Sequence, residues 1–459
     1  MKAADVQNKK NDNGQDTLGT DTLIIGGGLA GLAAGYALEG KIPYIIAEKE
    51  CFPGGLSATL KRNGYSFDFS GHLLHLRWPQ TKALILKLLA GNFNTLARDA
   101  RVYMLGRQLP FPFQANLKKL PEKVRSECIR EFLKAADAAE GKTRGKKDSC
   151  SVPDTDFYSG WAERTFGKGI CRHFMLPYNF KLLQYPLNLV TTEWCAPFIP
   201  VPDRNEVLQG AYGTGGRKFG YNTSFIYPLR GGIGALAEKF AENLKGLHTG
   251  MEVVSVNIKT HTALLKDSRR IKFRHLINTS PLNFFISIQE NTPENIKKAA
   301  SLLKSNTVYV LNLGVKKPVP KVHWGYFPEK KFPFYRAGIA SNFSKYTAPR
   351  GRASFYLEFA TAGDPIDFES AEQASFKALK ECGFIKNISQ IETKMWLRLS
   401  PAYVIYDKDR AKALPQISAW LAEKGIQSIG RYGAWKYSFM EEAVKEGLEA
   451  AENILKQAV

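Results

Sequence analysis

The strongest constraint on the fold is a glycine-rich turn near the start of the chain, set between two short apolar runs. Residues 22–35 read Thr-Leu-Ile-Ile-Gly-Gly-Gly-Leu-Ala-Gly-Leu-Ala-Ala-Gly, so Gly26, Gly28 and Gly31 match the spacing G-x-G-x-x-G. The first apolar run predicts a buried parallel strand, and the small residues after the turn predict a helix packed closely on a sheet. The second apolar run ends in an acidic residue, Glu48.

Each part of this pattern has a mechanical role in holding a dinucleotide. Gly26 makes the tight turn, Gly28 lets the backbone approach a pyrophosphate, and Gly31 allows close packing of helix on sheet. The helix N-terminus faces the phosphate charge, and the Glu48 carboxylate can accept hydrogen bonds from a ribose diol. The alternative is a glycine-rich turn in an ordinary α/β domain. Because strand, helix, second strand and acidic residue all fall in register, the sequence predicts a dinucleotide site.

The next segments distinguish between dinucleotides. Gly54, Gly55, Leu56 and Ser57 follow the acidic residue closely, and a strand-like run leads to Gly71-His72. This arrangement resembles flavoproteins of the amine oxidase and protoporphyrinogen oxidase superfamily, which implies FAD rather than NAD. The residues then expected at the cofactor are Gly26, Gly28, Gly31, Glu48, Gly54, Gly55, Leu56, Ser57, Gly71, His72, Val254, Gly430, Arg431 and Met440.

Charge and composition narrow the class of partner. The formal net charge is +21, which favours anionic partners such as nucleotides, phosphorylated substrates or the headgroups of an anionic membrane. No nucleic-acid module is apparent, so nucleic acid is not expected. The six cysteines and seven histidines have neither paired nor metal-ligand spacing, which predicts reduced thiols, no metal site and a cytoplasmic location. No apolar run reaches the roughly 18 residues of a membrane span. The oligomeric state stays open.

The order of patterns predicts an α/β fold: a Rossmann-type FAD-binding domain with an inserted helical subdomain and an antiparallel β-sheet substrate domain. We expect a flexible tail over 1–20 and FAD-binding segments at 21–80, 201–280 and 426–459. The expected helical subdomain is 81–200, in which the Pro- and Gly-rich stretch that starts near 186 and continues to 230 should form loops. The expected β-sheet domain is 281–425.

Several short motifs together resemble UDP-galactopyranose mutase, and the similarity spans nearly the whole chain from residue 21. The motifs are Gly71-His72, residues 109–114 (Leu-Pro-Phe-Pro-Phe-Gln), residues 176–181 (Leu-Pro-Tyr-Asn-Phe-Lys), residues 334–337 (Phe-Tyr-Arg-Ala), Ala402-Tyr403 and residues 430–437 (Gly-Arg-Tyr-Gly-Ala-Trp-Lys-Tyr). This resemblance implies an isomerase whose reduced flavin acts on the anomeric carbon of a diphosphate-linked sugar in polysaccharide biosynthesis, without net redox change.

The resemblance also implies roles for individual residues. It places His72, Arg336, Tyr403 and Tyr437 in the catalytic group, with Arg336 and the two tyrosines holding the substrate diphosphate. It places Arg431 near the FAD pyrophosphate. The other residues that it assigns to substrate binding are Phe111, Phe113, Gln114, Tyr178 and Asn179. From the residues alone, the tyrosines could equally be core side chains, and Phe113 and Gln114 could simply close a turn.

Two positions depart from the mutase pattern. Leu183 stands where the family has a tryptophan, and Phe198 stands where it has a second diphosphate arginine. A phenylalanine cannot replace the bidentate phosphate contact of a guanidinium, so Arg204 or Arg217 would have to substitute. Two functions therefore remain: a flavin-dependent nucleotide-sugar mutase, or an FAD-dependent oxidoreductase of the amine oxidase type.

Overall fold

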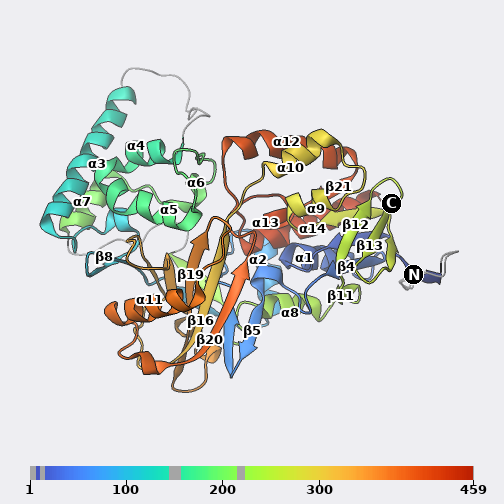
Figure 1. Ribbon diagram of the computed structural model, residues 1–459, viewed down its shortest axis with the longest axis horizontal. Helices are drawn as coiled ribbons and strands as arrows, with labels where there is room; N and C mark the ends of the chain where they lie inside the picture. The colour runs from blue at the N-terminus through green and yellow to red at the C-terminus, as the bar shows by residue number, and fades with distance from the viewer. Residues whose placement is uncertain (1–6, 11–15, 144–156, 214–222, 458–459) are drawn as a thin grey trace.

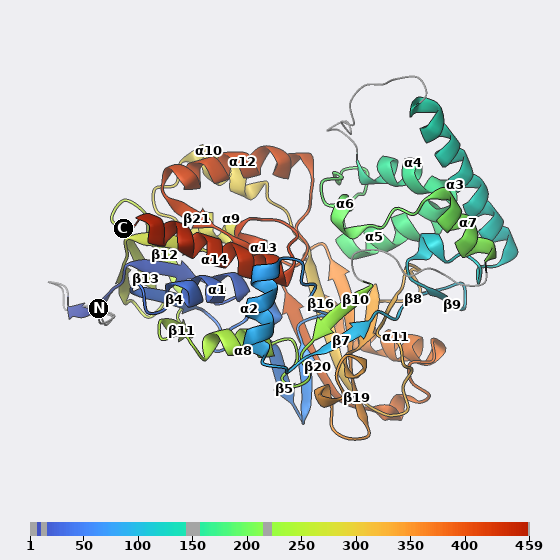
Figure 2. The ribbon, with the colours of Figure 1, turned by 180° about the vertical axis from the view of Figure 1, so that it is seen from behind.

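The computed structural model describes residues 7–10, 16–143, 157–213 and 223–457, and it has three parts (Figures 1 and 2). A parallel sheet with its helices lies near both termini, a long seven-stranded sheet forms the middle, and a group of helices lies at the far end. This mixed α/β architecture confirms the predicted fold class.

The parallel sheet holds the glycine-rich turn. Its strand order is β11-β4-β3-β15-β21, and every neighbouring pair is parallel. The strands are β11 (Leu247–Thr249), β4 (Tyr44–Glu48), β3 (Thr22–Ile25), β15 (His275–Asn278) and β21 (Ile426–Ser428). All residues of β3 and β4 are buried, as expected for strands covered on both faces. Helix α1 (Leu29–Leu38) packs against α14 (Met440–Gln457), so the two ends of the chain meet here.

Other helices of this part come from distant segments. Helix α8 (Ala235–Ala241) packs against α1 and against α2 (Pro79–Leu89). Helices α9 (Leu282–Ser287), α10 (Glu294–Ser301) and α12 (Lys408–Glu423) lie beside β21 and α14, away from the seven-stranded sheet, although we expected 281–425 to belong to the β-sheet domain (Figure 1).

A second five-stranded sheet borders this part and corrects one prediction. Its order is β1-β2-β14-β13-β12, with β1 (Gln7–Lys10), β2 (Asp16–Gly19), β14 (Arg270–Lys272), β13 (Thr262–Leu265) and β12 (Val253–Asn257). Residues 1–20 were expected to be a tail, but β2 pairs in parallel with β14 and Leu18 packs against the core. The apolar Leu18, in an otherwise polar segment, provides the burial that holds this strand.

The seven-stranded sheet has the order β20-β16-β19-β18-β17-β8-β9. Its strands are β20 (Ile391–Leu399), β16 (Thr307–Lys316), β19 (Arg352–Thr361), β18 (Arg336–Ile339), β17 (Trp324–Tyr326), β8 (Ala100–Met104) and β9 (Arg107–Pro110), and α11 (Phe368–Glu381) packs near it. It is not wholly antiparallel, because β17 and β8 are parallel. Strands β8 and β9 come from the stretch expected to be mainly helical, as does β7 (Asn94–Ala97), which pairs with β10 (Ser224–Tyr227).

The far group contains α3 (Glu122–Thr143), α4 (Tyr158–Ile170), α5 (Leu176–Leu183), α6 (Cys195–Phe198) and α7 (Arg204–Tyr212). The prediction of loops throughout 186–230 is wrong for α7. Asp203 and Glu206 form a reciprocal capping box there, and the helix packs against α3. The Lys181 ammonium joins these helices to the sheet, because it donates to the carbonyls of Phe327, Glu329 and Phe332 at 2.6–3.0 Å. Among the described residues, no helix is both long and apolar enough to cross a bilayer.

Candidate functional site

The glycine turn has the geometry of a phosphate cradle. Gly26 has φ +103°, and a Cβ on Gly31 would lie 2.0 Å from the Gly26 carbonyl oxygen, so neither position accepts a side chain. At Gly28 a Cβ would meet no atom within 4 Å, so the backbone here faces open space. Gly28 is also the N-cap of α1, whose first turn has no acidic residue to offset the positive end of the helix. These features fit an incoming pyrophosphate.

Glu48 ends β4 beside this turn, where the sequence placed it. Its carboxylate accepts hydrogen bonds from the backbone N–H groups of Gly27 (2.6 Å) and Glu50 (2.8 Å), which fix its orientation. The side chain is buried, and burial raises the pKa of its carboxyl group above the usual value. Two carboxylate oxygens provide about four lone-pair sites, so acceptor capacity is left for a ribose hydroxyl.

The remaining residues that we assigned to the cofactor lie at different distances from the turn. Gly54 bridges to Gly28, its N–H donates to the Gly27 carbonyl at 2.8 Å, and Gly55 and Ser57 follow in a short 3-10 turn. Val254 lies on β12 with an exposed side chain, so its assignment to the cofactor stays a prediction. Gly430 closes on α1 from the other side, where a Cβ would lie 3.0 Å from the Cβ of Ala30.

A cavity of about 300 Å³ opens where the three parts of the molecule meet. Residues from α5, β18 and α13 (Gly430–Gly433) line it, among others. Eight of the residues predicted from sequence line this cavity: Leu56, Gly71, His72, Arg336, Tyr403, Arg431, Tyr437 and Met440. The fold therefore brings residues from five separate stretches of the chain to one cavity.

Arg336 forms a buried ion pair that the sequence analysis missed. Its guanidinium donates two hydrogen bonds to the Glu358 carboxylate, from Nε at 2.8 Å and from Nη2 at 2.7 Å, and a third from Nη2 to Ser70 Oγ at 3.2 Å. The two residues face each other in the register of β18 and β19. Glu358 has no exposed surface. Burial acts to raise its pKa, but the charge of Arg336 together with the hydrogen bonds from Arg336, Ser70 and Tyr335 holds the pKa below the usual value, so the pair is ionised.

Arg431 supplies a second positive charge to the cavity. Its guanidinium lies over the rings of Tyr437 at 5.4 Å and Tyr403 at 5.7 Å, and it donates to the Ala402 carbonyl at 3.3 Å. Among the described residues its contacts are a carbonyl and aromatic rings rather than a carboxylate, so its charge remains available to an anion. The rings of Tyr403 and Tyr437 meet edge to face at 5.9 Å, which places both hydroxyl-bearing rings on one wall.

His72 lies in the same cavity as a neutral ring. Burial is the main cause that lowers its pKa to about 4, and the charge of Arg431 adds to the effect. Its Nδ1 has no hydrogen-bond partner among the described residues. An unpaired, enclosed ring nitrogen can pair with a polar group of a bound cofactor or substrate.

Further aromatic side chains line the cavity next to Tyr437 and form an aromatic wall. Phe198 contacts Phe439 at 5.1 Å and Tyr437 at 5.9 Å between ring centroids, and Trp194 contacts Tyr437 at 5.7 Å. The guanidinium of Arg77 lies 4.6 Å from the centre of the ring of Phe439, the residue directly before α14. Phe198, which stands where the mutase resemblance has a second diphosphate arginine, therefore belongs to an aromatic wall.

Arg204, one of the two proposed substitutes for that arginine, does not line the cavity. Arg204 forms an ion pair with Asp137 at 2.7 Å on the helical group, which leaves its guanidinium engaged elsewhere. Arg217 lies outside the described residues.

Five residues assigned to substrate binding do not line the cavity. Phe113 and Asn179 are buried, the first stacked on Phe174 at 5.0 Å and the second bonded to the Tyr158 hydroxyl at 2.7 Å. Gln114 is buried too, and its amide donates to the Pro200 carbonyl at 2.6 Å. Phe111 and Tyr178 each contact the cavity residue Tyr326, at 4.6 Å and 5.3 Å. Their roles in substrate binding stay predictions.

Sequence reasoning missed other lining residues, including Ser70, Tyr335, Tyr356, Trp194 and Phe439. Glu358 had a usable signal, since it is the only charged residue in the run 353–359 (Ala-Ser-Phe-Tyr-Leu-Glu-Phe). A lone carboxylate in a buried strand requires a partner. The aromatic residues had none, because aromatic side chains occur as commonly in any core.

Comparisons with known proteins agree with this geometry. A solved structure titled reduced UDP-galactopyranose mutase superposes with a TM-score of 0.87 at 26% identity, covering 96% of each chain. A putative protoporphyrinogen oxidase from Exiguobacterium matches with a TM-score of 0.70 at 15% identity, covering 95% of this chain and 99% of that one. Putrescine oxidase bound to putrescine gives 0.63 at 15% identity, covering 96% and 100%.

The family model described as flavin containing amine oxidoreductase matches residues 29–455. The match begins at the first residue of α1, directly after Gly28, and ends within α14, so it includes Glu48 of the cofactor cradle and all residues that line the cavity. The cofactor of this flavoenzyme is FAD, and the chain belongs to the flavin-containing amine oxidoreductase family.

Proposed function

We propose that this flavoenzyme is a nucleotide-sugar mutase that acts on a diphosphate-linked sugar in glycan assembly. The observation that carries the proposal is the convergence of Arg336, Arg431, Tyr403 and Tyr437 on one cavity next to His72. The similarity in fold and sequence to a reduced UDP-galactopyranose mutase supports the same function. When bound, FAD in its reduced form would supply a nucleophile for the anomeric carbon of the sugar.

The residues of the chain would bind and orient the substrate. Arg431 would attract the diphosphate, since its charge is not paired with a carboxylate among the described residues, and Arg336 would present its remaining N–H groups while Glu358 and Ser70 hold the guanidinium in place. The hydroxyls of Tyr403 and Tyr437 can donate to phosphate oxygens. Because His72 is neutral at pH 7, it can accept or donate one hydrogen bond without adding charge beside the flavin.

A specific observation favours a second candidate, an oxidoreductase of the amine oxidase type. The aromatic wall of Phe198, Phe439 and Trp194 suits an apolar substrate better than a second phosphate group. The pair of Arg336 with Glu358 also cancels one of the two positive charges. On this alternative the substrate would transfer electrons to oxidised FAD, and an acceptor such as oxygen or a quinone would reoxidise the flavin.

One experiment distinguishes the two candidates. The purified holoenzyme is reduced under anaerobic conditions, mixed with UDP-galactopyranose or its furanose form, and the sugar nucleotides are separated by chromatography. The mutase proposal predicts interconversion by the reduced enzyme and none by the oxidised enzyme. Absence of conversion, together with reduction of the oxidised flavin by an amine or another organic substrate, would support the oxidoreductase and overturn the mutase proposal.

A further inference from the structure

One short segment supplies six of the residues around the cavity. Residues 430–440 include Arg431, Tyr432, Tyr437, Ser438, Phe439 and Met440, all of which line it. The segment begins beside the cofactor cradle, where Gly430 approaches Ala30 of α1. It ends at the N-terminus of α14. Its position therefore decides where the cavity lies relative to the flavin.

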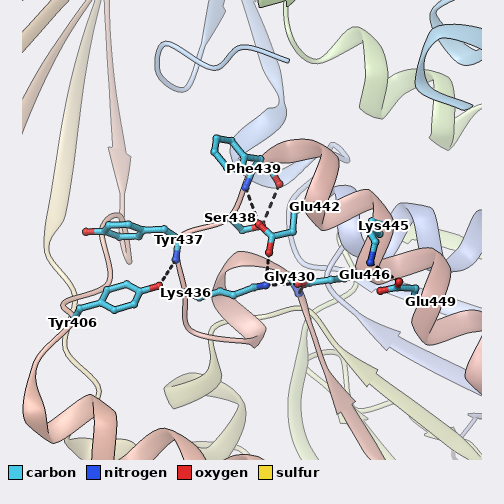
Figure 3. A network of polar contacts seen from close by, with 10 residues as sticks. All are labelled: Tyr406, Gly430, Lys436, Tyr437, Ser438, Phe439, Glu442, Lys445, Glu446 and Glu449. Atoms are coloured by element: carbon cyan, nitrogen blue, oxygen red, sulfur yellow. Dashed lines mark hydrogen bonds and ion pairs between the residues drawn. The ribbon is translucent and has the colours of Figure 1, made fainter. Parts of the chain in front are cut away.

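Two carboxylates one turn apart on α14 hold this segment (Figure 3). Glu446 accepts a hydrogen bond from the Gly430 N–H at 2.7 Å, and Glu442 is within 3.4 Å of the Phe439 N–H. The Lys436 ammonium lies between them, at 2.6 Å from Glu442 and in close contact with Glu446. The start, middle and end of the segment are thus tied to one face of one helix.

The segment needs such a restraint. Trp435, directly before the lysine, is fully buried and has φ +49°, a left-handed conformation that is unfavourable for a bulky residue. On the cavity side of the lysine, the Tyr437 N–H donates to the Tyr406 hydroxyl at 2.9 Å. The Lys436 side chain points to α14 (Figure 3). Arg431 and Tyr437, on either side of it in sequence, line the cavity.

Lys436 also has an electrostatic task. Without it, Glu442 and Glu446 would place two negative charges at the segment that adjoins the glycine turn, where a pyrophosphate would bind. The three side chains are only 19–28% exposed, so water screens these charges incompletely.

We propose that Lys436 is a positioning residue: by pairing with both Glu442 and Glu446 it fixes segment 430–440 so that Arg431 and Tyr437 face the substrate while Gly430 closes on the cofactor. The choice of UDP as the test ligand rests on the proposed function. The measurements on the bound flavin do not, because FAD binding follows from the family.

The test compares three substitutions in the holoenzyme. Lys436→Met removes the charge at similar length, and Lys436→Arg restores it. Lys445→Met is the matched control, because Lys445 pairs with Glu449 at 2.5 Å on the same helix and does not line the cavity. The measurements are the visible spectrum of the bound flavin, the rate of FAD release and the affinity for UDP. We expect Lys436→Met to weaken UDP binding by roughly tenfold or more and to speed FAD release. Lys436→Arg should recover most of both, and Lys445→Met should change neither.

Glu446→Gln keeps the proposal testable if Lys436→Met fails to fold. Glutamine preserves an acceptor for the Gly430 N–H but loses the ion pair with Lys436, so we expect a smaller loss of UDP affinity. Because it also removes a negative charge beside the glycine turn, FAD release should stay close to that of the unmodified enzyme. The proposal is overturned if Lys436→Met only lowers the melting temperature while flavin spectrum, FAD release and UDP affinity equal those of the unmodified enzyme. It is also overturned if Lys436→Arg recovers nothing. If the unmodified enzyme itself does not bind UDP, the proposed function fails, and the flavin measurements alone decide on Lys436.

Discussion

The cofactor cradle and the substrate cavity are neighbours, but they are built in different ways. The cradle offers the cofactor mainly its backbone: N–H groups, the N-terminus of helix α1 and the space left by glycines, all within residues 22–55. The cavity is formed by side chains from many separate stretches of the chain, and the charge of its Arg336 is paired with Glu358. Substitutions in the cradle should therefore affect stability and binding by steric clash and altered packing, whereas substitutions in the cavity should affect them by changing charge.

The largest effect is expected at Glu358. Glu358→Ala leaves the Arg336 charge without its buried partner, which should cost about 3–5 kcal/mol in the free energy of unfolding. Glu358→Gln, which keeps an acceptor oxygen, should cost less. Denaturant unfolding measures both. A cost below about 1 kcal/mol for the alanine variant would contradict the view that charge pairing holds the cavity together.

Two glycines of the cradle give a matched comparison. Gly31→Ala should destabilise the protein by about 1–3 kcal/mol, because its Cβ would collide with the Gly26 carbonyl. Gly28→Ala has no atom to collide with, so the stability of the apoprotein should change by less than about 0.5 kcal/mol while FAD affinity falls. Unfolding of the apoprotein and titration with FAD measure these changes. Equal losses of stability in the two variants would remove the distinction between packing and ligand approach.

The neutral state of His72 predicts a pH dependence of stability. Its pKa is about 4 in the folded protein, against an ordinary value of 6.5, so below pH 6.5 the unfolded chain takes up a proton that the folded chain does not. Stability is fully present above pH 6.5 and is lost as pH falls towards 4. His72→Gln should reduce the loss between pH 7 and pH 5 by up to about 2 kcal/mol.

The dependence should not vanish in that variant, because burial also lowers the pKa of His75 to about 4. Denaturant unfolding at the two pH values provides the test. An identical pH dependence in the two proteins would mean that His72 is not held neutral in the cavity.

The aromatic wall offers a smaller but more specific effect. If the cavity binds a nucleotide diphosphate but lacks the second arginine that would contact the phosphates, Phe198→Arg should tighten binding about tenfold, or about 1.4 kcal/mol. Phe198→Met serves as the control that keeps the wall apolar. Tighter binding by both variants, or loss of stability without tighter binding by the arginine variant, would favour an apolar substrate and the oxidoreductase.

The same contrast explains what the sequence could predict. The residues of the cradle lie close together in the sequence, so the glycine spacing and Glu48 were enough to predict it. The side chains of Arg336, Arg431, Tyr403 and Tyr437 were assigned to the substrate site by the resemblance to a known family. The pairing of Arg336 with Glu358 depends on the register of two strands, which no local pattern specifies. Helix α7 had a local signal in the Asp203–Glu206 spacing of a capping box, within a stretch whose prolines and glycines favoured loops. Strand β2 pairs with β14, where Arg270 lies 253 residues after its partner Thr17, so the polar sequence of β2 alone indicated a tail.

The central claim is that this cavity binds a nucleotide diphosphate through its arginines. The most direct measurement is a calorimetric titration of UDP into the reduced holoenzyme and into Arg336→Lys. Lysine keeps the charge beside Glu358 but cannot form the planar fork. The account predicts saturable binding by the unmodified enzyme and a loss of roughly tenfold or more in the variant, at equal FAD content. No binding by the unmodified enzyme, or equal affinity in both proteins, would contradict it.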